Sequence, residues 1–250
     1  MKAAILPYKL GNTYSKELAV ALGGFRINPA ANTYRRQQDH RIINWGCSHT
    51  HYQFEDRDFN HPSAVARAVN KLASFEVWKR EGVECPDFTT SRQQAQQWLN
   101  NGSVVYARDR VTGARGEGIT VLQPWDDAGN HRFWTKAVDI VREYRIHAAA
   151  YGAIIDVTQK LRRNGHPDVN PLVRTSENGW VFCRNRIIQP RQSTLALCAR
   201  AVSKLGLDFG GVDCCETHNG AVVFEVNTAP AIEGTTIQHY VDFFKGFLNG

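Results

Sequence analysis

The sequence predicts a protein of the α+β class, from three observations. Predicted strands surround a few predicted helices in mixed order along the 250 residues. Two pairs of predicted strands are joined by turn sequences typical of β-hairpins, at residues 151–152 and 218–220. No regular alternation of strand and helix runs along the chain, so a repeated βαβ wheel is not expected.

The first 60 residues predict a small α/β unit. Residues 2–8 and 41–45 are short apolar runs typical of strands, and residues 15–22 form a short helix pattern that two glycines end. Next comes a polar stretch at 47–60, which His61 follows. Its histidines leave a metal site open as one interpretation, although scattered histidines in a polar loop are more often solvated.

The middle of the chain predicts one long helix and then a strand-rich segment. Apolar residues at helical spacing predict a helix that Ser63 caps and Gly82 ends. A short strand and a helix capped by Thr90 or Ser91 follow. Strands are then expected at residues 103–109, 119–123 and 131–138, with a glycine-bearing segment at 110–118 between the first two.

The last 110 residues predict two hairpins and two amphipathic helices. The first hairpin is expected to join strands at 143–150 and 153–163. A helix at 193–207 precedes the second hairpin, at 208–227, and a helix at 237–248 follows it.

Composition limits the class of protein. The chain carries 42% hydrophobic residues, which suffices for a core, and it has no run of about 18 apolar residues that could span a membrane. The short apolar start lacks the features of a signal peptide, and six cysteines without paired spacing favour free thiols, so we expect a cytoplasmic protein. The net charge of +6 fits an anionic substrate or nucleotide and leaves nucleic acid open as a partner.

The second hairpin carries a candidate metal site. Side chains two residues apart in a strand share a face, so Glu225 and Asn227 are expected to lie together, with Val223. If the turn has three residues, 218–220, Thr217 pairs with Ala221 and Asp213 pairs with Glu225, about 5 Å apart. Carboxylate and amide oxygens are ligands for hard cations such as magnesium. An acidic strand edge facing solvent is the alternative interpretation.

The glycine-bearing segment and several basic residues could surround a polyphosphate. The segment lies between strands and opens no helix, which argues against a Walker loop, but its backbone N–H groups could close over phosphates. Each basic side chain alone is more often a surface residue. Together with an acidic metal face, they would suit a polyphosphate: Lys71, Arg108, Lys136, Arg145 and Lys160.

Four stretches resemble the ATP-grasp superfamily, in its order and spacing: "AVNKLASFEVWKREGVECPDFTTS", "VVYARDRVTGARGEGITV", "FWTKAV" with "EYRIHAAAYGAIIDVTQKLRR", and "LGLDFGGVDCCETHNGAVVFEVNTAPAIEGTT". The sequence is most similar to RimK-like carboxylate–amine ligases and to short members found in bacteriophage genomes. The resemblance implies an ATP-grasp fold of two α+β subdomains gripping ATP. It implies a small N-terminal unit at 1–60 and an ATP-grasp domain at 61–250, with a lid subdomain at about 86–135 and a metal-binding subdomain at about 136–250.

The resemblance also implies roles for individual residues. Asp213, Glu225 and Asn227 would hold Mg²⁺, or Mn²⁺ in its place, on the phosphates of ATP. Arg145 and Lys160 would be catalytic, facing the phosphates or the acyl phosphate. The remaining candidates would bind ATP: Lys71 and Arg108 at phosphate; Thr112, Gly113, Arg115, Gly116 and Gly118 in the lid; Lys136, Ala137 and Val138 at adenine; Glu143 at ribose; and the pair Arg174 and Asn178. Arg108 stands where the family more often has Lys.

The implied activity is ATP-dependent ligation. A carboxylate would attack the γ-phosphate, and an amine, or a thiol, would then displace phosphate from the acyl phosphate. The sequence names neither substrate and leaves a homo-oligomer open. Two alternatives remain: an inert nucleic-acid-binding or bacteriophage structural protein that retains the fold, and an ATP-grasp kinase.

Overall fold

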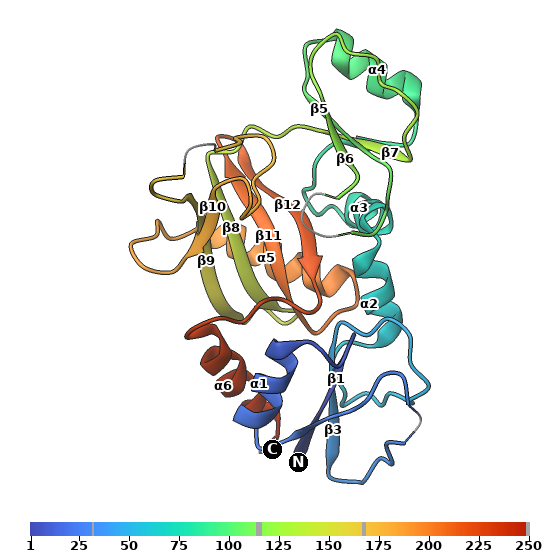
Figure 1. Cartoon of the computed structure of the whole chain (residues 1–250), viewed down its shortest axis with the longest axis vertical. Coiled ribbons are helices and arrows are strands. Elements are labelled where there is room, and N and C mark those ends of the chain that lie inside the picture. The colour runs from blue at the N-terminus through green and yellow to red at the C-terminus, as the bar shows by residue number, and fades with distance from the viewer. Residues whose placement is uncertain (32, 114–116, 167–168, 249–250) are drawn as a thin grey trace.

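The computed structural model describes residues 1–31, 33–113, 117–166 and 169–248, which form three β-sheets with helices against them. Figure 1 shows a three-stranded N-terminal sheet at one end, a four-stranded sheet at the opposite end and a five-stranded sheet between them. The two ends of the chain lie together beside the N-terminal sheet.

The N-terminal unit is a parallel sheet with its first strand in the centre. Its elements are β1 (Lys2–Pro7), α1 (Thr13–Ala21), β2 (Phe25–Arg26) and β3 (His40–Trp45). The last helix, α6 (Thr236–Leu248), lies beside α1 (Figure 1) and shares a buried core with it and with this sheet. The C-terminal helix therefore packs with the first 60 residues, although it follows the central sheet in sequence.

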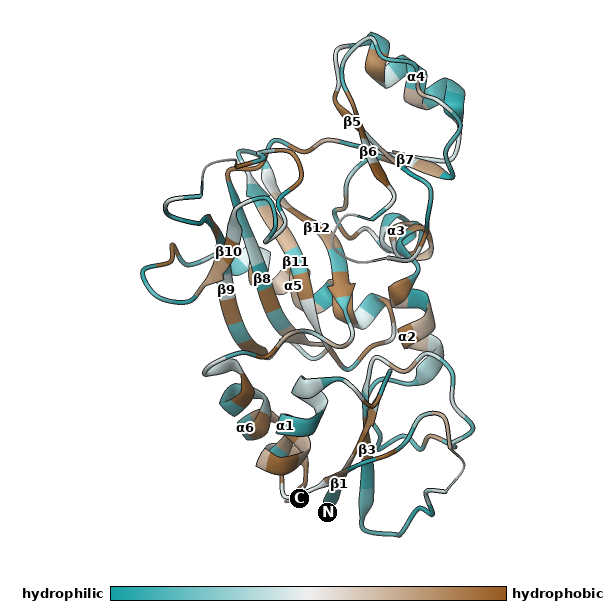
Figure 2. Ribbon diagram, in the orientation of Figure 1, coloured by the Kyte–Doolittle hydropathy of each residue, from teal (hydrophilic) through white to brown (hydrophobic). Residues whose placement is uncertain are grey.

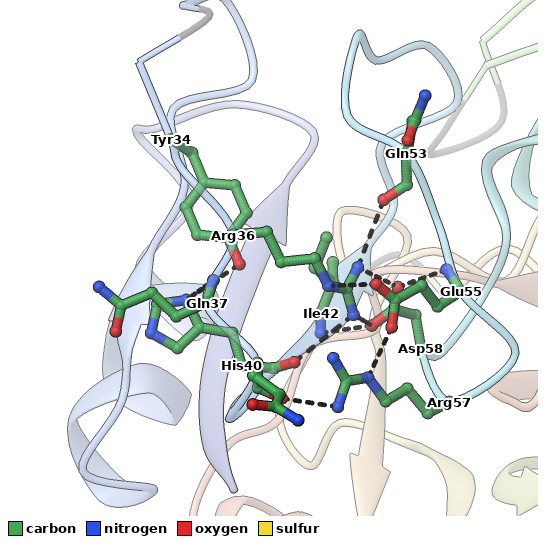
Figure 3. A network of polar contacts seen from close by, with 10 residues as sticks. Tyr34, Arg36, Gln37, His40, Ile42, Gln53, Glu55, Arg57 and Asp58 are labelled. Atoms are coloured by element: carbon green, nitrogen blue, oxygen red, sulfur yellow. Dashed lines mark hydrogen bonds and ion pairs between the residues drawn. The ribbon is translucent and has the colours of Figure 1, made fainter.

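Loops held by an ion pair cover the other face of the N-terminal sheet (Figure 3). Arg36 donates two hydrogen bonds, of 2.7 and 2.8 Å, to the buried carboxylate of Asp58. Asp58 also accepts from the backbone N–H of Ile42 in β3, at 2.8 Å. This carboxylate thereby joins the loop before β3 to the loop after it, so that two loops cover a sheet face without a helix.

The central sheet is antiparallel throughout and has the order β10-β9-β8-β11-β12. One face packs on α5 (Gln192–Lys204) through apolar side chains such as Ile146, Val212 and Val226. The other face carries charged side chains, and Figure 2 shows the resulting alternation of hydrophobic and hydrophilic residues along the strands. The strands are β8 (Arg142–Ala149), β9 (Ile154–Arg162), β10 (Trp180–Cys183), β11 (Phe209–Thr217) and β12 (Gly220–Asn227).

The hairpin of β11 and β12 differs from the prediction near its turn. Thr217 pairs with Gly220 and not with Ala221, so the turn has two residues. A β-bulge between Asp213 and Cys214 then adds one residue to β12 and restores the expected pairing of Asp213 with Glu225. The predicted face of Val223 is wrong: because of the bulge, Val223 lies in the core and not beside Glu225.

The four-stranded sheet has the order β4-β7-β5-β6, and its antiparallel pairs surround a small core of their own. Ser91 caps its helix, as expected for one of the two predicted caps, by accepting a hydrogen bond from the backbone N–H of Gln94. The elements of this subdomain are β4 (Phe88–Thr89), α4 (Arg92–Asn100), β5 (Val105–Arg108), β6 (Ile119–Leu122) and β7 (Phe133–Lys136).

The single helix predicted from Ser63 to Gly82 is two helices. Asn70 has extended backbone angles (φ −91°, ψ 102°) that end α2 (Pro62–Val69), and its side chain caps α3 (Lys71–Arg80) by accepting from Ala73 N–H at 3.1 Å. Apolar periodicity alone could not reveal this break, because the apolar positions continue across it. The break puts Lys71 in the first turn of a helix.

Two short strands were not predicted, namely β2 and β10. Both have few residues, and neither has the length of apolar alternation that marks a strand in sequence. None of the helices in the described ranges is long and apolar enough to cross a membrane. All six cysteines carry free thiols.

Candidate active site

A cavity of about 750 Å³ lies over the charged face of the central sheet. Its walls come from that sheet, from the start of α3, from β5 to β7 and from the segments that follow β9 and β12. The cavity thus joins segments that are as far apart in sequence as Lys71 and Glu233.

Strand pairing arranges the charged side chains in rows across the sheet. One row runs through Thr158, Arg145, Asp213 and Glu225 on four neighbouring strands. A second row, nearer β7, pairs Lys160 with Glu143. A third row, on the side of the N-terminal unit, contains Asp156, His147, Gly211 and Asn227. Neighbouring rows are two residues, or about 7 Å, apart along each strand.

The three predicted metal ligands converge. The side-chain amide of Asn227 donates to Glu225 Oε1 at 3.2 Å and approaches Asp213 Oδ2 at 3.5 Å. Asp213 and Glu225 are directly paired across the two strands. Two carboxylates and an amide therefore share one small volume, and the two carboxylate residues line the cavity.

Arg145 neutralises Asp213. Its Nε and Nη2 atoms donate to the two carboxylate oxygens at 2.6 and 2.8 Å, which is a bidentate pair. Burial alone would raise the pKa of Asp213, but the Arg145 charge and its hydrogen bonds hold that pKa below the ordinary value. Burial likewise opposes the charge of Arg145, and the Asp213 charge more than offsets it, so the pKa of Arg145 is raised.

Lys71 neutralises the other carboxylate. Its ammonium group forms an ion pair with Glu225, and both side chains are partly buried, at 18% and 31% exposure. The backbone N–H of Lys71 donates to Val111 O at 2.7 Å, which ties the start of α3 to the segment after β5. Helix α3 therefore delivers a cation to the acidic hairpin from outside the sheet.

The second row has its own ion pairs. Lys160 binds Glu143 through a hydrogen bond, and Arg174 lies 3.6 Å from the same carboxylate. Burial raises the pKa of Glu143, and the Lys160 charge only partly opposes this effect. Phe182 on β10, which sequence reasoning missed with its strand, lies under the Arg145 guanidinium and the Lys160 ammonium, at 4.5 and 5.0 Å from the ring centre.

Arg108, at the end of β5, presents an unpaired buried group. Its Nε atom is buried and has no hydrogen-bond partner among the described residues, while its guanidinium lies 5.8 Å from the ring centre of Phe133. Burial lowers the pKa of Arg108. Because an unsatisfied buried donor is costly, this side chain is suited to an anionic ligand in the cavity.

The remaining predicted residues are divided between the cavity and its surroundings. Thr112, Gly113, Lys136 and Val138 line the cavity. Gly118, Ala137 and Asn178 do not line it. Asn178 instead donates to Val173 O at 2.7 Å and so supports the loop that carries Arg174. The predicted lid residues Arg115 and Gly116 lie outside the described residues.

Sequence reasoning missed four charged or polar residues at the end of the cavity nearest the N-terminal unit. Arg184, His147 and Glu233 line the cavity there, and Asp156 lies directly behind Arg184. His147 is buried, and this burial, with the nearby Arg145 charge, lowers its pKa to about 3. The alternation of Asp156, Thr158 and Lys160 along β9 was the signal available for Asp156.

The hairpin residues fit a divalent cation by their chemistry. Asp213 and Glu225 offer carboxylate oxygens, which Mg²⁺ prefers, and Asn227, whose NH2 group faces these carboxylates in the free protein, would offer its Oδ1 after rotation of the amide. In the described part of the chain, no group of three or more His, Cys, Asp or Glu side chains could hold a metal ion. The hairpin site has only two residues of these types, Asp213 and Glu225, since its third member is the amide of Asn227. The histidine-rich loop contains no such group either; His49 contacts Ser48 and His61 contacts Ser63.

Two curated relatives resemble the chain in sequence. A probable alpha-L-glutamate ligase from Serratia proteamaculans is 28% identical over 242 residues, which cover 83% of this chain and 76% of that protein. The ribosomal protein bS6–L-glutamate ligase of Salmonella paratyphi B is 26% identical over 238 residues, with the same coverage. No family model matches the chain.

Solved structures resemble it over nearly its whole length. The ATP-grasp ligase PsnB, complexed with a phosphomimetic variant of its minimal precursor, Mg and ADP, gives a TM-score of 0.69 at 11% identity and covers 98% of both chains. A RimK domain ATP-grasp protein from Sphaerobacter thermophilus gives 0.62 at 13% identity, covering 100% of this chain and 98% of that one. None of these comparisons bears on the expected bacteriophage origin.

Proposed function

The chain has the ATP-grasp fold and is RimK-like in sequence, and from this premise we propose that it is an ATP-dependent carboxylate–amine ligase that uses Mg²⁺. ATP would be cleaved to ADP and phosphate while a carboxylate and an amine are joined. The amine is the nucleophile that attacks the activated carboxylate, and a thiol could take this role instead.

One observation carries the proposal: the two carboxylates of the β11–β12 hairpin meet two cations at the cavity wall, with the amide of Asn227 beside them. A buried carboxylate needs a positive partner, and Arg145 and Lys71 supply it in the free protein. Asp213, Glu225 and Asn227 would hold Mg²⁺, which when bound would supply positive charge beside the phosphates. Arg145 and Lys71 could then bind the phosphates. Asp213, Glu225, Arg145 and Lys71 thus form ion pairs with one another in the free protein and would bind Mg²⁺ and ATP in the complex.

We assign the remaining cavity residues to the phosphates, the adenine and the ribose of ATP. Arg108 and Lys160 place positive charge around the phosphates, and Arg108 has the unpaired Nε for it. Thr112 and Gly113 reach the cavity from the segment predicted to be the lid. We assign Val138, which lines the cavity from the connection between β7 and β8, to adenine. Lys160 and Arg174 hold Glu143, which we assign to ribose.

The reaction follows from these positions. A substrate carboxylate beside Arg145 attacks the γ-phosphate, ADP leaves, and an acyl phosphate forms. The amine then attacks the acyl carbon and phosphate leaves. The acyl phosphate carries negative charge that the guanidinium of Arg145 stabilises, since its planar fork can bind two oxygens at once. The chain's contribution is to hold the reactants together and to neutralise charge.

Product analysis tests the proposal. Purified protein would be incubated with Mg²⁺, ATP and a panel of carboxylates, with hydroxylamine as the nucleophile, while ADP, free phosphate and hydroxamate are quantified. A ligase produces the three in equal amounts, and EDTA abolishes all of them. Relatives named for glutamate ligation make acidic peptides and L-glutamate the first compounds of the panel.

Two results would overturn the proposal. ADP formed with a phosphorylated product and without free phosphate would identify a kinase. The absence of Mg²⁺-dependent binding of an ATP analogue, measured by calorimetry, would favour a protein that retains the fold without catalysis.

A further inference from the structure

One edge of the four-stranded sheet is open. Strand β6 (Ile119–Leu122) is the last strand in the order β4-β7-β5-β6, in the sheet that lies opposite the N-terminal sheet in Figure 1. It pairs with β5 on one side, and none of the described helices packs closely along its other side. The strand contains no charged residue and no proline, which are common protections of an exposed edge against pairing with another chain.

The strand register identifies the open backbone groups. Asp109 N–H donates to Gly118 O at 3.0 Å, so residues 118 and 120 direct their backbone groups towards β5. Ile119 and Val121 alternate with them and direct their N–H and C=O groups away from β5. Among the described residues, no hydrogen bond engages these four groups. The edge therefore offers two donors and two acceptors in one row.

The other long edge strands are partly covered on their outer sides. In β12, Val223 N–H donates to Glu84 O at 2.9 Å. In β10, Trp180 N–H donates to Thr175 O at 3.2 Å, and β3 exchanges hydrogen bonds with Phe59. Over the described ranges, β6 alone among edge strands of four or more residues lacks such a partner.

Strand β6 is complementary to a second copy of itself. In an antiparallel pair with its two-fold axis at Thr120, Ile119 of each copy lies opposite Val121 of the other, and all four open groups of each strand form hydrogen bonds. The two Thr120 side chains then face each other, which is a favourable cross-strand pair. The flanking pair joins the exposed residues Glu117 and Gln123, a carboxylate and an amide. No two like charges lie opposite each other in this register.

The neighbouring two-fold registers fit less well. An axis at Val121 would place Ile119 opposite Gln123, whose N–H already donates to Asp126 Oδ2 at 2.7 Å and whose C=O accepts from Asp126 N–H at 3.1 Å. An axis at Ile119 would place the apolar Val121 opposite the carboxylate of Glu117. The axis at Thr120 is therefore the register that satisfies the open groups.

An exposed aromatic ring lies just beyond the end of β6. Trp125 is 73% exposed, and its φ of 75° is a left-handed conformation that is uncommon for a large side chain. In an antiparallel pair the C-terminal end of β6 lies beside the start of the strand in the other copy. A strained turn that exposes tryptophan at this end suits a protein contact, because aromatic residues are enriched at interfaces.

We infer that two copies of the chain associate through their β6 strands, antiparallel and centred on Thr120, so that two four-stranded sheets become one sheet of eight strands. The partner is thus a second copy of this chain. A contact between two short strands is small, so the dimer is weak and depends on protein concentration. The inference does not depend on the proposed ligase function.

Sedimentation equilibrium from low micromolar to submillimolar protein tests the association. The wild type should change from monomer to dimer over this range. Val121→Pro removes an N–H group that the monomer does not use, as an edge strand tolerates. The dissociation constant of the dimer should rise about tenfold or more, because each dimer loses two hydrogen bonds. Val121→Ala keeps the N–H group and is the matched control, expected to stay within about threefold of the wild type.

Cysteine cross-linking tests the register. Thr120→Cys places two thiols directly opposite each other, with Cβ atoms about 4.5–5.5 Å apart, so a small shift forms a disulfide. Incubation with oxidised glutathione should convert most of this variant to a linked dimer on a non-reducing gel. The wild type, with its six native cysteines, and Gln97→Cys, at an exposed position of α4, should remain monomeric on the gel.

Three results overturn the inference: a wild type that is monomeric at every concentration, equal association of Val121→Pro and Val121→Ala, or Thr120→Cys that links no faster than Gln97→Cys. The first result would also be obtained if a different protein pairs with this edge. Thermal melts check that the two Val121 variants are folded, and the cross-linking result decides if Val121→Pro is not.

Discussion

At the scale of single residues, the active-site carboxylates are paired with cations before any ligand arrives. Asp213 and Glu225 would repel each other across the hairpin if Arg145 and Lys71 were absent. Such a site is stable in the free protein and can exchange its internal cations for phosphate and metal partners. Its binding affinity therefore reflects the difference between two sets of ion pairs.

Replacing Glu225 with Gln should separate function from stability. The change removes a proposed metal ligand and leaves the shape of the side chain, so Mg²⁺-dependent ATP turnover should fall by about 10² to 10³-fold. The Lys71 pair is partly exposed, so the melting temperature should shift by less than about 4 °C. Glu76→Gln, an exposed position on the same helix as Lys71, is the control for turnover. Wild-type turnover in the Glu225 variant would contradict the metal assignment.

His147 makes the stability depend on pH. Its pKa is lowered to about 3 by burial and by the Arg145 charge, so the folded protein keeps His147 neutral while the unfolded chain binds a proton below about pH 6.5. The unfolded state then holds more protons. The unfolding free energy should consequently fall as the pH falls from about 6.5 towards 3, by about 1.4 kcal/mol per pH unit from this group.

Denaturant titrations at pH 7, 6, 5 and 4.5 measure this effect, with His147→Gln as the comparison. The variant should lose less stability between pH 6 and 4.5 than the wild type. The range ends at 4.5 because carboxylates with lowered pKa values, such as Asp213, begin to contribute below it. Parallel pH profiles for the two proteins would show that His147 does not stay neutral in the folded state.

At the scale of elements, the acidic hairpin shows what sequence can and cannot predict. The pairing of Asp213 with Glu225 was predicted and is confirmed, yet it came from a turn one residue too long. The bulge at Phe224 compensates for that error, because it adds to β12 the residue that the turn lacks. Bulges depend on tertiary packing and leave no periodic signal, so the face of Val223 could not be assigned correctly. The charged row itself was predictable from residue types, while Arg184 and Glu233 required the spatial arrangement.

The break between α2 and α3 positions Lys71. Asn70→Ala should remove the side-chain cap of α3 and favour a continuous helix, at a cost of about 1 kcal/mol in the unfolding free energy. The same change should weaken binding of an ATP analogue, since Lys71 would leave its place beside Glu225. Calorimetry and denaturant titration measure the two effects. Ser91→Ala removes the comparable cap of α4 and should cost similar stability with unchanged nucleotide affinity; equal affinity in both variants would contradict the role of the break.

At the scale of the whole molecule, the central sheet lies between the two other sheets (Figure 1). Its apolar face packs on α5, and α2 contacts β12, while its charged face forms the floor of the cavity. The order of strands and helices was predicted almost completely, because each long element has a clear periodic pattern. The joining of the two chain ends was not predicted, because no local pattern encodes the partner of α6.

Phe244 connects the N-terminal unit to the central sheet. This residue of α6 is fully buried, and its ring centre lies 5.2 Å from those of both Phe59, before α2, and Phe209, at the start of β11. Phe244→Ala should reduce the unfolding free energy by about 3–5 kcal/mol, because it leaves a cavity where the two parts meet. Val20→Ala, at an exposed position of α1, should change it by less than about 0.5 kcal/mol.

Denaturant titration with two probes distinguishes a shared core from separate domains. The fluorescence of Trp45, one of six tryptophans, is isolated as the difference from a Trp45→Phe counterpart and reports on the N-terminal sheet. Far-UV circular dichroism reports on the whole chain. Because Phe59, Phe209 and Phe244 share one core, both probes should shift together in Phe244→Ala and keep a single transition. A Trp45 transition that moves alone would mean that residues 1–60 unfold independently of the central sheet. The hydrogen bond of Tyr14 to Glu233, which joins α1 to the segment after β12, would then be lost before the central sheet unfolds.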